Sequence, residues 1–126
     1  MGSGNIITTG RLTITDILLE NSAIIANKKN IDIDIGTETV DSFADTLGDS
    51  ATWLYLVKNG DNRRAGMIIA CWNDSNDTTE YNEVTTLDIG NTSDVTFEVD
   101  INSNTVRLRT SVLSNNWEVR VIRLLV

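Results

Sequence analysis

Apolar and polar residues alternate along most of the chain, and a period of two is typical of half-buried β-strands. Residues 30–36, NIDIDIG, predict a strand with three isoleucines on one face and two aspartates on the other. Residues 51–60, ATWLYLVKNG, predict a strand that ends in a turn. Residues 66–74, GMIIACWND, predict the next strand, and their apolar run indicates burial on both faces. Residues 80–90 predict a longer and more polar strand.

Helical periodicity is almost absent. The only candidate is a helical turn within residues 41–51, DSFADTLGDSA, which Asp41 or Ser42 could cap. Many short strands with polar turns between them favour two stacked sheets. We therefore expect an all-β protein, an antiparallel, jelly-roll-like β-sandwich of about eight strands with an extended N-terminal arm.

The C-terminal residues predict three strands joined by two tight turns. A turn at residues 103–104 would place Asp100 opposite Arg107 and Glu98 opposite Arg109 on the outer face. Each exposed pair contributes only about 0.2–1 kcal/mol, but it also opposes a one-residue slip of the register. These four residues are therefore predicted to be register-setting charge pairs.

A second turn at residues 115–116 would match Val112 with Val119. Residues of one parity in these strands should then form one side of the core. They are Val95, Phe97, Val99, Ile101, Val106, Leu108, Val112, Val119 and Val121.

Residues 1–30 differ from the rest, because short apolar stretches are broken by small polar residues and no aromatic residue is present. They could add strands to the sandwich or pack on another chain, and we favour the second, with ANKKNID as a hinge. The predicted division is an attachment and oligomerisation arm at 1–30 and a sandwich domain at 31–126. The predicted contact residues of the arm and of the apolar C-terminal tail are Ile6, Ile7, Leu12, Ile14, Leu18, Leu19, Ile122 and Leu124.

The composition of the chain argues against several classes of function. The chain has no histidine and one cysteine, Cys71, so the commonest general base and a cysteine-based zinc site are missing. Cys71 is expected to be a small buried residue. The net charge of −8 argues against nucleic acid and anionic membrane surfaces as partners. No apolar run is long enough to insert into a membrane. We expect no enzyme activity, no cofactor and no metal.

Four groups of residues could bind a ligand or a partner. The acids of residues 74–80 lack the spacing of a calcium loop and are expected to form a solvated loop, and GDNRRAG at 60–66 lacks the spacing of a phosphate loop and is expected to be a mobile hairpin loop. Trp53, Trp72 and Trp117 could stack on a glycan, although such positions also suit the core. The arginines of residues 102–126 could pair across strands or meet the acids of a neighbouring subunit.

Six segments follow one another in an order that is informative. They are VDSF (40–43), WLYLV (53–57), MIIACW (67–72), EYNEV (80–84), FEVDINSNTVRL (97–108) and WEVRVIR (117–123). In this order they resemble a β-sandwich module of tailed-bacteriophage virion proteins, of the tail-fibre or capsid-decoration type. That family has a turn glycine where this chain has Asn104, and asparagine also accepts a positive φ.

The resemblance implies a module at the end of a fibre or on a capsid, often a trimer, without catalytic residues. We therefore expect a structural protein on the exterior of a virion, made in the host cytoplasm: a decoration or cement protein, or a short-fibre component. Its expected partners are itself, as a homotrimer, and other virion proteins such as the major capsid or tail protein. The alternative is a receptor-binding or glycan-binding module of a tail fibre, with a host surface glycan as its ligand.

Overall fold

Nine strands and one short 3₁₀ turn make up the chain in the computed structural model, which describes residues 4–5, 7 and 9–126. The strands are β1 (Asp16–Leu18), β2 (Ile24–Ile33), β3 (Gly36–Ala44), β4 (Ser50–Asn59), β5 (Asn62–Asn73), β6 (Thr78–Thr85), β7 (Val95–Asn102), β8 (Thr105–Val112) and β9 (Trp117–Leu125), and the turn is η1 (Asp45–Leu47).

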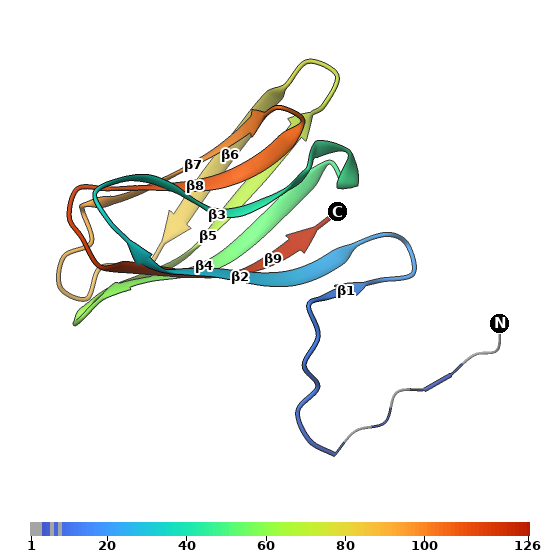
Figure 1. Cartoon of the computed structure of the whole chain (residues 1–126), viewed down its shortest axis with the longest axis horizontal. Coiled ribbons are helices and arrows are strands. Elements are labelled where there is room, and N and C mark those ends of the chain that lie inside the picture. The colour runs from blue at the N-terminus through green and yellow to red at the C-terminus, as the bar shows by residue number, and fades with distance from the viewer. Residues whose placement is uncertain (1–3, 6, 8) are drawn as a thin grey trace.

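The strands form two stacked sheets (Figure 1). One sheet has the order β1–β2–β9–β4–β5–β6, the other the order β3–β8–β7, and all pairings between these strands are antiparallel. The consecutive strands β2 and β3 pair with β9 and β8 in opposite sheets, as in a jelly roll, whereas β4, β5 and β6 form a meander. The predicted all-β, antiparallel sandwich is confirmed.

The core lies between the two sheets and is built from alternate residues of each strand. Seven of the nine residues predicted from the C-terminal strands are buried. The other two, Phe97 and Ile101, are partly buried and pack against the core. Phe97 reaches the ring of Tyr55, at 4.7 Å between centroids, so it covers the edge of the core rather than its centre.

The hairpin of β7 and β8 has the predicted register. Asp100 lies opposite Arg107, and Glu98 lies opposite Arg109. Its turn places two consecutive residues at positive φ, Ser103 at 51° and Asn104 at 63°, as a two-residue hairpin of the right twist requires.

The second predicted hairpin is wrong. The turn near Asn116 does not pair β8 with β9, because β9 lies in the other sheet. Val112 lies opposite Gly36 and Val95, not Val119. Both valines face the same core from opposite sheets, so shared parity could not distinguish a hairpin from a crossing between the sheets.

The predicted boundary at residue 30 is also wrong. Strand β2 runs across it and pairs with β9, so ANKKNID is part of a strand rather than a hinge. Ile24 and Ala26 are buried under the smaller sheet. Within the predicted arm, the described residues before β1 have no strand structure, and Figure 1 shows residues 9–15 running away from the sheets.

Two strand predictions change in detail. The segment NIDIDIG is not one alternating strand: the register of β2 shifts between Asn30 and Ile33, and the chain then turns, so Ile31 and Ile35 are exposed and only Ile33 is buried. The apolar run of β5 is buried on one face only. Ile69 is 48% exposed, and Cys71, which was expected to be buried, is exposed as well.

The segment after Thr39 contains a β-bulge that positions a charged residue between the two sheets. A register shift in β3 between Thr39 and Asp41 leaves Val40 and Asp41 buried in succession, so this bulge turns an aspartate inward. Asp41 therefore does not cap a helix, and neither does Ser42: the 3₁₀ turn begins later, after Ala44, without a side-chain cap.

Arg123 on β9 pairs with Asp41 inside the core. Its Nη1 atom donates to both carboxylate oxygens at 3.0 Å, and the Nε1 atom of Trp53 donates to the same carboxylate at 2.9 Å. The guanidinium also lies 4.6 Å from the centroid of the Phe43 ring. The pair thus joins β3 of the small sheet to β9 and β4 of the large sheet.

Replacing Arg123 by methionine should cost about 3–5 kcal/mol of unfolding free energy, because Asp41 would remain buried without its countercharge. Urea denaturation measures this. Arg120→Met is the matched control on the same strand: its side chain is 55% exposed, and the loss should stay below about 1 kcal/mol. Equal losses for both variants would contradict a stabilising role of the buried pair.

Candidate functional site

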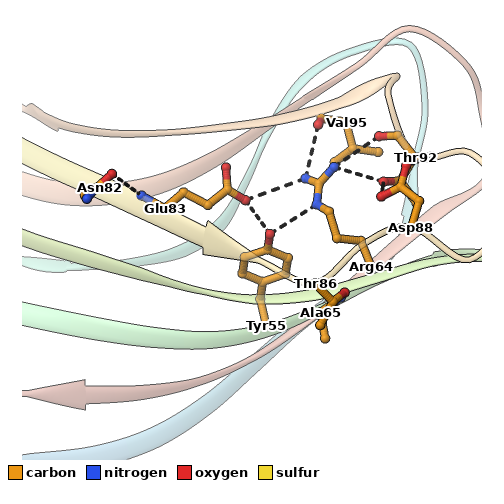
Figure 2. Close-up of polar contacts among 9 residues, drawn as sticks. All are labelled: Tyr55, Arg64, Ala65, Asn82, Glu83, Thr86, Asp88, Thr92 and Val95. Atoms are coloured by element: carbon orange, nitrogen blue, oxygen red, sulfur yellow. Dashed lines mark hydrogen bonds and ion pairs between the residues drawn. The ribbon is translucent and has the colours of Figure 1, made fainter.

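A second cluster of buried polar groups surrounds Arg64 where β4, β5 and β6 approach the start of β7. Figure 2 shows the guanidinium between Tyr55 of β4, Glu83 of β6 and the backbone of Thr92 and Val95. Arg64 has inward parity in β5, which it shares with Ile68 and Trp72 of the core. The prediction of a mobile hairpin loop at GDNRRAG is therefore wrong for this arginine, which lies in β5 with a side chain that is only 11% exposed.

Four hydrogen bonds and one ion pair join the Arg64 guanidinium to groups of its own chain. Nε donates to the Tyr55 hydroxyl at 3.1 Å, and Nη1 donates to the carbonyl and hydroxyl oxygens of Thr92 at 3.2 and 3.0 Å. Nη2 donates to the Val95 carbonyl at 3.2 Å and lies 3.7 Å from a Glu83 oxygen. Four of the five N–H donors that an arginine carries are thus accounted for by hydrogen bonds within the chain.

The loop between β6 and β7 is held by the same cluster. Asp88 accepts hydrogen bonds from the backbone N–H and the hydroxyl of Thr92, at 2.8 and 2.7 Å. These bonds, that from the hydroxyl first, lower the pKa of the Asp88 carboxyl. Thr92 is fully buried and also accepts from Arg64, so it connects the loop to β5.

The Tyr55 hydroxyl donates a hydrogen bond to Glu83. Burial, and next this hydrogen bond, raise the pKa of Tyr55 to about 12, although Arg64 acts in the opposite direction. The phenol therefore keeps its proton at neutral pH and cannot serve as a base or a nucleophile there. The geometry and the protonation state together describe a closed structural cluster.

The part of the chain that the structure describes contains neither a cluster of metal ligands nor a helix that could span a membrane. There, no three histidine, cysteine, aspartate or glutamate side chains come close enough to hold a metal ion. Among the same residues, no helix has the length and hydropathy needed to cross a membrane.

The three tryptophans predicted as a glycan platform are buried. Trp53 is 0%, Trp117 2% and Trp72 7% exposed. Each indole N–H donates inside the protein: to Asp41, to the Ser114 hydroxyl and to the Asp45 carbonyl, in that order. The glycan hypothesis for these residues does not fit their positions, because the indole rings pack between the sheets and offer no open face for a sugar.

The predicted charge pairs lie on the outer face of the small sheet. Arg107 binds Asp100 through two hydrogen bonds of 2.8 and 2.6 Å, which raise the pKa of Arg107, and Arg109 lies 3.7 Å from Glu98. The other two arginines of this region also have acids of their own chain: Glu118 for Arg120 and Asp41 for Arg123. All four arginines that were considered for a subunit contact are thus paired with acids of their own chain, as the alternative of pairing within the chain predicted.

The predicted contact residues are solvent-exposed wherever the structure describes them. Ile6 lies outside the described residues. The exposed ones are Ile7, Leu12, Ile14, Leu18, Leu19, Ile122 and Leu124. The exposed fraction reaches 87% for Ile7 and 69% for Leu18. A protein that stays monomeric in water rarely exposes so many large apolar side chains close together.

Sequence reasoning missed Arg64 and the Asp41–Arg123 pair. The signal was present in the alternation: counting by twos back from Trp72 reaches Arg64, and counting on from Val121 reaches Arg123. Arg64 was instead expected in a hairpin loop, and Arg123 was expected to pair across strands or to meet the acids of a neighbouring subunit.

Comparison with known proteins gives no evidence about the function of this chain. No family model, no curated protein and no solved structure matches this chain.

The Tyr55 cluster makes a prediction for titration. In a Tyr81→Phe variant, which leaves Tyr55 as the only tyrosine, the ultraviolet signal of tyrosinate should appear with a midpoint near 12. Because the folded pKa lies above the ordinary value of 10, stability should be unaffected below about pH 10 and should fall as the pH rises toward 12. A tyrosinate midpoint near 10 in the folded protein would show that the phenol is neither buried nor bound.

Proposed function

We propose that this protein is a structural subunit on the exterior of a tailed-phage virion, a capsid decoration or cement protein or a short-fibre component, which assembles with its own copies and with another virion protein. The observation that carries the proposal is the exposure of large apolar residues before and within β1 and at the end of β9.

The cost of that exposure supports assembly. Burying one such side chain is worth about 1.5–3 kcal/mol, so covering most of the seven described residues would gain on the order of 10 kcal/mol. This is comparable to the whole stability of a small domain. Closed rotational symmetry would give every copy the same cover, and a homotrimer is the arrangement that we propose.

The polar interior supports a structural rather than a catalytic role. Both buried clusters are held by hydrogen bonds within the chain, and Tyr55 holds its proton. The virion setting is supported by the ordered segments that resemble phage exterior modules, and by a sandwich fold of the kind that such modules have. Residues before β1 would attach the subunit to a capsid or tail protein.

The full-length protein should therefore run as an assembly of three chains in light scattering. Particles purified from the phage that encodes it should contain the chain by mass spectrometry, with antibody access from the outside in electron micrographs. Absence of the chain from washed particles would contradict a virion role.

Attachment can be tested separately from assembly. A chain that begins at Asp16 keeps all nine strands and should keep its mass in solution. It should no longer co-sediment with particles made by a phage that lacks the gene, whereas the full-length chain should. Equal binding of both chains would contradict attachment through the residues before β1.

A further inference from the structure

The two outer faces of the sandwich differ in chemistry. On the small sheet, outward residues of β3, β7 and β8 are polar apart from one alanine: Thr37, Thr39, Ser42, Ala44, Thr96, Glu98, Asp100, Asn102, Thr105, Arg107, Arg109 and Ser111. This is the composition expected of a sheet face in water.

The large sheet presents apolar side chains on its outer face instead. The large ones are Ile17, Ile25, Leu54, Leu56, Met67, Ile69, Val84, Ile122 and Leu124, and we call them the outer apolar face.

The strand registers make this face continuous. Ile122, Leu54, Met67 and Val84 stand side by side on four neighbouring strands, β9, β4, β5 and β6. In the next row, Ile17 and Ile25 lie beside Leu124. Strands are about 4.8 Å apart, so these side chains touch one another across the sheet.

We propose that the outer apolar face is the surface through which copies of this chain pack on one another in the trimer, with the β5–β6 side of the face in one copy lying over the groove on β2, β9 and β4 of the next copy. The proposal names the contact on which the self-assembly part of the proposed function rests.

Shape supports a second copy as the occupant. A groove of about 750 Å³ crosses β2, β9, β4 and β5, with Leu54, Leu56 and Ile122 in its lining. Beyond it, Ile69 of β5 and Val84 of β6 are 48% and 58% exposed. One copy thus carries both an apolar groove and, on another part of the same face, apolar side chains that can fill the groove of the next copy, which is what a closed ring of identical chains needs.

Charge supports the same occupant. The chain has a net charge of −8, so two copies repel each other over most of their surface. The outer face of the large sheet is an exception, because its cations Lys29, Lys58, Arg63 and Arg120 outnumber its acids Glu80 and Glu118. Lys29 lies at the β2 side, beside the groove, and Glu80 lies on the edge strand β6. Placing the β6 side of one copy over the groove of another brings opposite charges to the margins of the contact.

The chain contains its own probe of this surface. Cys71, its single cysteine, is exposed and lies on the outer face, two residues beyond Ile69 and beside Glu80. Its reaction with a maleimide should be slow in the assembly and should become several-fold faster when a dilution series of the wild-type protein reaches the mass of one chain.

Variants locate the contact. Leu54→Asp and Ile122→Asp should each lower the mass in light scattering to that of one chain and expose Cys71 at all concentrations, because a charge would be buried in the contact. Thr96→Asp is the matched control, an exposed strand residue on the polar face of the small sheet, and should keep both the wild-type mass and the slow reaction. Circular dichroism establishes that each variant is folded.

The outcomes are separable. Wild-type mass in both folded Asp variants, or a Cys71 that reacts equally fast in the assembly and in the single chain, would overturn the proposal. A wild-type protein that is a single chain in solution, with Cys71 protected only on particles, would also overturn it and identify another virion protein as the occupant. In that case the virion role itself would stand, whereas absence from particles would remove that role and leave the self-association result valid.

Discussion

The ion pair of Asp41 and Arg123 is the contact that fixes how the two sheets lie on each other. Neither charge reaches water, and an unpaired charge in this position would be strongly unfavourable. The pair can form only if the bulge at Val40 turns Asp41 inward and if β9 presents Arg123 beneath it. Trp53 and the Phe43 ring complete its surroundings. A slip of either strand by one residue would bury one charge without the other, so the pair excludes neighbouring registers as well as stabilising this one.

The cluster around Arg64 acts in the same way at a different place. It connects β4, β5 and β6 with the loop before β7, a segment that has no strand partner of its own except an isolated bridge between Arg63 and Ile89. Among the described residues, three buried side-chain atoms have no hydrogen-bond partner, namely Nε of Arg109, Nε of Arg123 and the hydroxyl of Thr110, and only the Arg123 atom belongs to either cluster. An interior that is closed in this way leaves recognition to the outer surfaces of the sandwich.

The sequence predicted well what short-range constraints determine. The β7–β8 hairpin followed from turn residues and charge pairs that are neighbours in the chain, and both are where they were expected. The predicted domain boundary at residue 30 was wrong because β2 pairs with β9 at the other end of the chain. The composition near residue 30 carries no information about that partner. The contacts of Arg64 and Arg123 were not predicted, for a different reason. The alternation of apolar and polar residues gives both arginines inward parity, but only the structure shows the acceptors that make an inward charge acceptable.

The apolar run of β5 was a prediction that one copy of the chain fulfils only in part. Ile68 and Ile69 are adjacent, so they point to opposite sides of the sheet, and the run suggested that both sides are covered. In one copy only the side of Ile68 is covered. A strand that is apolar on both faces is typical of a sheet between two layers, and here the small sheet supplies one layer. If the outer apolar face packs on another copy, that copy supplies the second layer, and the pattern of β5 is then the pattern of a strand that is buried in the assembly. The polar outer face of the small sheet has no such run in β3, β7 or β8, so the sequence distinguishes the face that meets water from the face that meets a neighbour.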